Sequence, residues 1–187
     1  MKIIKSLVIF FFCAFLLTAG FQVVSALNTA DKLQSEVLRF HIKANSNSEE
    51  DQALKLKVRD AVLNETSYLF ENCKSSIEAA LIADDNKEKI LDVVKKTIAA
   101  EGYNYDASIE IKKTYFPTKE YENFMRFPAG TYDAVNIYIG SAKGENWWCV
   151  LYPPVCLSGA VNKENILNDV LSSESDEMVT SDKPIAK

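Results

Sequence analysis

The first 26 residues most constrain how this chain can fold, because their pattern is that of an export signal rather than of a globular core. Lys2 and Lys5 precede an unbroken apolar run from Leu7 to Leu17, and the tripeptide Val-Ser-Ala that ends at Ala26 has the small side chains that signal peptidase accepts. We expect cleavage after Ala26. The alternative is an uncleaved anchor, since the next charged residue is Asp31. Against it, the strongly apolar part of about 18 residues is marginal for a spanning helix, which needs roughly 20. Both alternatives place the rest of the chain outside the cytoplasm.

Without this segment about 160 residues remain, which is enough for one hydrophobic core and short for two. The formal net charge of the whole chain is −5, and it becomes −7 when Lys2 and Lys5 are removed. Nucleic acids and anionic lipid surfaces both select proteins with a basic face. We therefore expect no nucleic-acid partner, and membrane contact only through the N-terminal signal or anchor.

Three cysteines remain in the exported part, namely Cys73, Cys149 and Cys156. An odd number in a compartment that permits disulfides predicts one bridge and one free thiol. The Pro153-Pro154 pair can fold the chain back and bring two flanking cysteines within the Cβ separation of roughly 3.5 to 4.5 Å that a bridge requires. We predict a bridge between Cys149 and Cys156, with Cys73 free. The alternative is three buried, reduced cysteines.

Hydrophobic periodicity divides the exported part into strands and helices. The segments are a strand over 37–42, a helix that begins near Ser46 or Ser48, two helical pieces over 75–100, a strand over 107–116, a loop or hairpin over 117–126 and a strand over 132–139. This order predicts an α+β fold. We expect a small, one-sided mixed sheet of three to four strands, covered by two to three helices and followed by a C-terminal hook that the disulfide closes.

The composition also suggests where the domain begins and ends. We assign residues 1–26 to the signal peptide or anchor, 27–35 to a polar spacer, 36–160 to a single domain and 161–187 to an acidic tail. Serine and acidic residues dominate that tail, with few large apolar side chains to bury. We expect it to be largely disordered.

Catalytic chemistry has few candidate residues in this sequence. His41 is the single histidine, so zinc sites that need two or more histidines are excluded by count. We expect no metal, no cofactor and no catalytic site, and a solvent-facing or lightly packed His41. The sharpest enzymatic alternative is a cysteine nucleophile with His41 as its base, which would need a free thiol at Cys149 or Cys156.

Binding is the better functional class, because the only two tryptophans stand side by side next to the predicted disulfide. Rigid aromatic side chains lose little entropy on docking and are typical anchors of interfaces. We predict a receptor-binding surface at Asn146, Trp147, Trp148 and Tyr152. Adjacent residues in an extended chain point to opposite sides, so one tryptophan could instead belong to the core.

Two long segments carry a resemblance to a known family. They are LRFHIKANSNSEEDQALKLKVRDAVL from Leu38 to Leu63 and FPAGTYDAVNIYIGSAKGENWWCVLYPPVC from Phe127 to Cys156, with the shorter YFPTKEY from Tyr115. In the same order along the chain, they resemble the stage II sporulation protein R family of endospore-forming bacteria. One position departs from the family pattern, which has an acidic residue after Ala-Asn-Ser where this chain has Asn47.

The resemblance implies a function that composition and periodicity do not reach. It implies a signal that is made in the forespore and exported into the space between the two septal membranes. There it would trigger a membrane-embedded aspartic protease of the mother cell, which processes the precursor of the sigma-E transcription factor. An exported cysteine-dependent hydrolase and a module that binds the cell wall or a lipid surface remain as alternatives.

Overall fold

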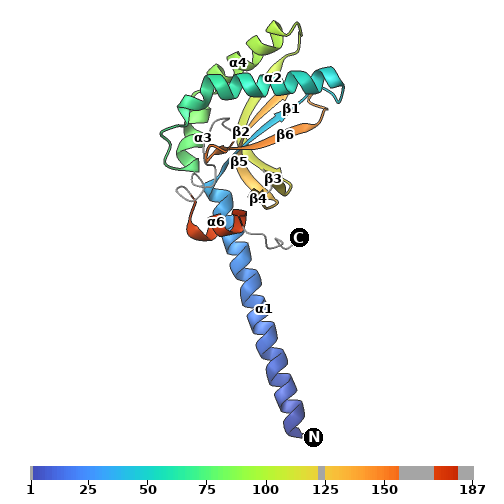
Figure 1. The fold of residues 1–187 in the computed structure, drawn as a ribbon, viewed down its shortest axis with the longest axis vertical. Helices are drawn as coiled ribbons and strands as arrows, with labels where there is room; N and C mark the ends of the chain where they lie inside the picture. Colours follow the sequence, from blue (N-terminus) through green and yellow to red (C-terminus); the bar gives the residue numbers. More distant parts are fainter. Residues whose placement is uncertain (1, 122–124, 156–170, 181–187) are drawn as a thin grey trace.

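The structure is a computed structural model, and it describes residues 2–121, 125–155 and 171–180. A small α+β domain stands at one end of a long N-terminal helix (Figure 1). The elements are α1 (Lys2–Glu36), β1 (Leu38–Lys43), α2 (Glu49–Thr66), the short 3-10 helix η1 (Ser67–Leu69), α3 (Ser76–Asp85), α4 (Lys87–Ala100), β2 (Ala107–Phe116), β3 (Lys119–Tyr121), β4 (Met125–Phe127), β5 (Gly130–Ile139), β6 (Asn146–Tyr152) and α6 (Ser173–Thr180).

Four strands form the main sheet in the order β2-β5-β1-β6. β1 runs parallel to β5 and antiparallel to β6, and β2 runs antiparallel to β5. The predicted α+β class with a mixed sheet of three to four strands is therefore confirmed. β1 lies between two partners and is buried on both sides, which places its side chains at the centre of the molecule.

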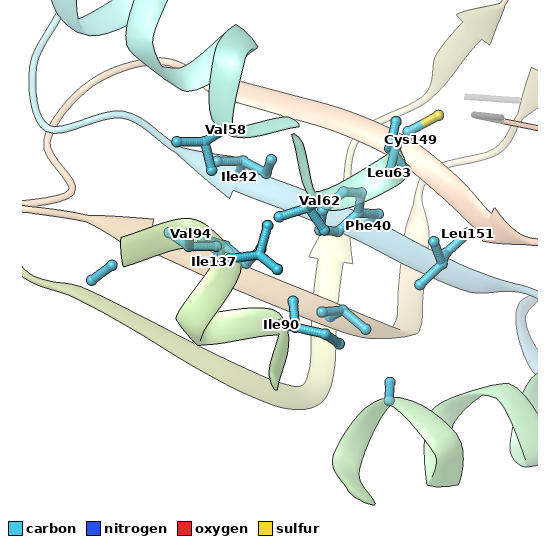
Figure 2. Packing of buried hydrophobic residues seen from close by; sticks show 14 of the residues in the cluster. Phe40, Ile42, Val58, Val62, Leu63, Ile90, Val94, Ile137, Cys149 and Leu151 are labelled. Carbon is cyan, nitrogen blue, oxygen red and sulfur yellow. The ribbon is translucent and has the colours of Figure 1, made fainter. Parts of the chain in front are cut away.

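Helices α2, α3 and α4 pack on one face of this sheet. Phe40 and Ile42 of β1 meet Val58 of α2 and Val94 of α4 in the main core, as Figure 2 shows. The helix boundaries follow the predicted signals, because the hydroxyl of Ser48 accepts a hydrogen bond from the backbone N–H of Asp51 at the start of α2.

The opposite face of the sheet, here called the far face, carries a second cluster of buried residues. Its members come from the end of α1, the sheet, the β3–β4 hairpin and the region of α6, and they include Leu33, Val37, Phe116, Met125, Phe127, Tyr132, Val150, Leu171 and Val179. The expectation of a one-sided sheet is therefore wrong. Alternating polar residues in the strands suggested a solvated face, whereas the aromatic residues of the hairpin cover one half of it.

Helix α1 passes without interruption from its apolar part into the domain. Its large apolar side chains between Ile3 and Leu27 are exposed. Its last turn is held by the buried Leu33 and by Gln34, whose side-chain oxygen accepts from Thr131 N at 3.0 Å. The predicted spacer 27–35 is thus helical. Among the described residues, α1 is the one helix long and apolar enough to cross a membrane, which fits a signal or an anchor.

Part of the predicted disordered tail is helical. Ser173–Thr180 forms α6, and Leu171 and Val179 are buried in the far-face cluster. The backbone N–H and hydroxyl of Ser172 both donate to the carboxylate of Glu36 on α1. The expectation of disorder is wrong for this stretch. Two widely spaced apolar side chains are enough to order it, because the far-face cluster offers an apolar surface on which they pack. The rest of the tail lies outside the described residues.

Strand β6 was not predicted. Its sequence, NWWCVLY, lacks an alternation of polar and apolar residues because both faces of its second half, from Cys149 to Tyr152, are covered. Cys149 and Leu151 belong to the helix-covered core, whereas Val150 belongs to the far-face cluster. A strand with two buried faces shows a continuous apolar run, which periodicity alone does not distinguish from other buried segments.

Candidate functional site

The loop that follows β1 holds the loop between β5 and β6 in place. The side-chain oxygen of Asn45 accepts from Ser141 N at 2.9 Å, and its amide nitrogen donates to the carboxylate of Asp51 at 2.8 Å. The backbone oxygen of Asn45 also accepts from the Ser141 hydroxyl at 2.8 Å. We call this arrangement the Asn45 clamp. It explains the polar run after β1 as a structural device that sets where β6 begins.

Two glycines make room for the Asn45 clamp. A Cβ atom on Gly144 would lie 2.2 Å from the backbone oxygen of Ser46, and one on Gly140, whose φ is +57°, would lie 2.4 Å from the side-chain oxygen of Asn45. Asn47 adds a further contact by accepting from Glu145 N at 2.6 Å. An aspartate has the same acceptor, so the departure at Asn47 preserves this contact.

Arg39 lies at the centre of the far face and is fully buried. Its guanidinium carbon stands 4.5 Å from the ring centre of Phe116 and 5.0 Å from that of Tyr132. Nε donates to Cys149 O at 3.1 Å and Nη2 donates to the hydroxyl of Tyr121 at 2.9 Å, while Nη1 has no hydrogen-bond partner within the described part of the chain. Burial lowers the pKa of Arg39. Aromatic faces thus surround and stabilise this cation.

His41 is the next far-face residue along β1. It is buried to 5% exposure, whereas a solvent-facing or lightly packed side chain was predicted. Its ring stacks on Trp148 with the centres 4.2 Å apart and the planes 9° apart. Nδ1 lies 3.0 Å from the side-chain oxygen of Asn136, and Nε2 lies 2.9 Å from that of Asn146. Burial lowers the pKa of His41, because the imidazolium is poorly solvated there.

Around His41 the far face is open to solvent. The strand register places Lys43 beside Asn146 of β6 and Tyr138 of β5. These residues lie two positions along the strands from the His41–Trp148 pair, on the side away from the covered half. Lys112 of β2 approaches the ring of Tyr138 to 5.5 Å. We define the open patch as Lys43, Lys112, Tyr138, Asn146 and Trp148. It combines two half-buried aromatic rings with exposed polar groups on the rigid floor of a sheet.

The predicted receptor-binding residues fall in three different places. Asn146 is exposed and Trp148 is half-buried in the open patch. Trp147 is half-buried on the helix-covered side, where its ring centre lies 5.7 Å from that of Phe40 and 5.3 Å from the guanidinium carbon of Arg59. Tyr152 is buried to 4% exposure and joins the main core. Its side chain is therefore not placed to contact a partner.

Within the described residues, the geometry does not assemble the cysteine–histidine pair that a thiol hydrolase would need. Cys149 pairs with Phe40 and points into the helix-covered core, whereas His41 points to the far face. Cys73 is a free thiol whose pKa is raised by burial and by the charge of Glu78, so it is not activated. Cys149 is not a free thiol. Its predicted partner, Cys156, lies outside the described residues, so that bridge stays a prediction.

Metal binding also finds no support in this arrangement. Across residues 2–121, 125–155 and 171–180, no group of three or more His, Cys, Asp or Glu side chains is placed to hold a metal ion. The far face instead gathers a cation, an imidazole, amides and aromatic rings. Such groups suit recognition through stacking and hydrogen bonds.

Comparison with known proteins assigns the chain to a family. The family model described as Stage II sporulation protein R matches residues 34–162. The chain belongs to this family. It is also 37% identical over 169 residues to the Stage II sporulation protein R of Bacillus subtilis (strain 168), an alignment that covers 87% of this chain and 75% of that relative. The family has a signalling role in sporulation. No solved structure matches this chain.

The matched range has a clear structural meaning. It begins in the last turn of α1, includes the whole main sheet and leaves out the apolar part of α1. Both the Asn45 clamp and the open patch lie within it. The family is therefore matched through the folded domain and not through the apolar segment.

Proposed function

We propose that this protein is an exported signalling protein of sporulation that activates a membrane-embedded aspartic protease of the mother cell. Activation would lead to processing of the sigma-E precursor. The proposal is supported by membership of the stage II sporulation protein R family and by the apolar helix α1, which suits export from the forespore into the intermembrane space. It treats the protein as a ligand that binds the exposed side of the protease and performs no chemistry itself.

The open patch is the observation that carries the docking part of this proposal. Trp148 stacks on the buried His41, so its ring is held in one orientation before any partner arrives. Asn146 is exposed beside it, with its side-chain amide within hydrogen-bond distance of the same imidazole. Pre-ordered aromatic and amide groups pay a small entropic cost on binding. The proposed contact residues are thus Asn146 and Trp148, with Lys43, Lys112 and Tyr138 around them.

The predicted bridge between Cys149 and Cys156 belongs to the same proposal. It would tie the segment after β6 to the strand that carries Asn146 and Trp148. A closed loop of about eight residues stabilises a fold by roughly 2.5 kcal/mol in the chain-entropy estimate. Mass mapping of alkylated peptides should find these two cysteines joined and Cys73 labelled.

A bulky charged side chain in the open patch tests the proposed function. Asn146→Arg should leave the thermal midpoint nearly unchanged, since Asn146 is exposed, and should reduce sigma-E precursor processing in sporulating cells by at least tenfold. Asn64→Arg is the matched control, because Asn64 is exposed on α2 in the helix layer on the opposite side of the sheet. Normal processing with Asn146→Arg would rule out the open patch as the docking surface.

A further inference from the structure

His41 is held between two asparagines that differ in their freedom to turn. The side-chain nitrogen of Asn136 donates to the backbone oxygens of Glu110 at 3.3 Å and Ala134 at 3.0 Å. Its oxygen therefore faces His41, and it also accepts from the Thr114 hydroxyl at 3.1 Å. Because this oxygen can only accept, Nδ1 of His41 must carry a hydrogen. Nδ1, on the buried side of the imidazole, is therefore always protonated.

The outer nitrogen, Nε2, meets an amide that is able to turn. Asn146 is exposed, and its side chain makes no other hydrogen bond to the part of the chain that the structure describes. In the arrangement of the structure its oxygen faces Nε2 at 2.9 Å, which requires a hydrogen on Nε2 and hence a charged ring. A neutral ring has a lone pair at Nε2 and requires a donor. A half-turn of the Asn146 amide supplies its nitrogen as that donor and turns its oxygen outward.

We propose that His41 is a positioning residue whose protonation state sets which end of the Asn146 amide faces a partner. With neutral His41 the open patch presents the Asn146 carbonyl oxygen, which accepts hydrogen bonds. With charged His41 it presents the amide N–H groups, which donate them. The hydrogen-bonding character of the patch therefore depends on one proton, at Nε2 of His41. The part that concerns a partner rests on the proposed docking function.

The surroundings of His41 favour the neutral ring near pH 7. Lys43 on its own strand and Lys112 on β2 both disfavour a further positive charge, and Glu110 on β2 is paired with Lys112. Tyr138 of β5 lies at a ring distance of 6.1 Å, and β6 contributes the uncharged Asn146 and Trp148. The neutral state implies that the partner offers a hydrogen-bond donor to Asn146. Acidification would replace the acceptor with a donor.

Nitrogen NMR of the single histidine tests this inference directly. The full chain in detergent micelles, labelled with 15N-histidine, gives signals from His41 alone. We expect the Nδ1–H tautomer at pH 7.5 and a pKa below 6.5. The side-chain amide signals of Asn146 should shift with the same midpoint. The inference would be overturned by an Nε2–H tautomer at pH 7.5. It would also be overturned if the side-chain amide signals of Asn146 did not shift as His41 titrates.

The variant Asn146→Asp separates positioning from simple structural support. A carboxylate only accepts, so it should hold a hydrogen on Nε2 and raise the pKa of His41 by at least one unit, a tenfold change in proton affinity. Asn64→Asp adds the same charge on the opposite layer and should leave that pKa within about 0.2 unit, since exposed charges beyond a Debye length are screened. Equal pKa values in the two variants would overturn the inference. These measurements need no protease, so they can succeed even if Asn146→Arg signals normally and the docking proposal fails.

Discussion

At the scale of single residues, the far face is built around two basic side chains, neither of which has an acidic partner among the described residues. Arg39 is surrounded by aromatic rings, and His41 is stacked on Trp148 and held by two amides. Burying such groups costs free energy unless their hydrogen bonds are satisfied. The neutral form of His41 avoids most of that cost. The folded state is therefore more stable at high pH, where His41 is neutral.

The stability of the domain should therefore fall as the solution is acidified through the range in which His41 titrates. The folded pKa lies below the unfolded value of about 6.5, so the unfolded state binds the proton more readily. The contribution of His41 to the unfolding free energy is fully present above about pH 6.5. It is lost as the pH falls from there toward the folded pKa, by at most about 1.4 kcal/mol per pH unit. Urea unfolding of the full chain in mild detergent between pH 8 and pH 5 measures it.

A substitution isolates this contribution from that of the carboxylates. His41→Gln removes the titrating group, so the difference in unfolding free energy between the natural chain and this variant should shrink as the pH falls. A difference that stays constant from pH 8 to pH 5 would show that His41 keeps its unfolded pKa in the domain.

The sequence identified these residues only in part. Asn146 and Trp148 could be found because an adjacent tryptophan pair and the family resemblance marked that segment. His41 was expected to face solvent because a polar residue in an alternating strand usually does. Its actual environment depends on Trp148 and Asn136, which come from strands about 100 residues away in the chain. Single-sequence patterns do not report such long-range neighbours.

At the scale of the elements, the segments with a clear hydrophobic period were predictable, whereas β6 and α6 were not. The strand over 107–116 matches β2, and the two helical pieces over 75–100 match α3 and α4. By contrast, β6 and α6 are set by tertiary packing on the far-face cluster. In the loops, single residues mark positions where the backbone is tightly packed. Gly144 leaves the least room for a side chain.

Gly144→Ala should destabilise the domain by about 1 to 3 kcal/mol, in the range of backbone strain at a tightly packed position. A Cβ atom at this site would lie 2.2 Å from the Ser46 backbone oxygen, so the Asn45 clamp must open. Gly20→Ala in α1 is the control, because nothing lies within 4 Å of a Cβ atom there. Thermal melting of both variants checks the difference. An unchanged midpoint for Gly144→Ala would show that the clamp yields without cost.

At the scale of the whole molecule, the end of α1 is a part of the folded domain. Leu33→Ala should cost about 2 to 5 kcal/mol of unfolding free energy, as for other buried leucines. Leu27→Ala makes the same chemical change on the same helix where the side chain is 61% exposed, and should cost less than about 0.5 kcal/mol. Chemical unfolding of both variants measures this. Equal costs would mean that the domain folds independently of α1.

The uninterrupted course of α1 also limits how far this domain could travel. From Ala26 to Glu36 the helix rises only about 15 Å, at 1.5 Å per residue, and no flexible linker follows before β1. An uncut chain with α1 in a membrane would keep the open patch within a few nanometres of that membrane, in one fixed orientation. Cleavage after Ala26 would free the patch to diffuse across the gap. The peptidase cut would then decide whether the signal acts only on adjoining membranes or at a distance.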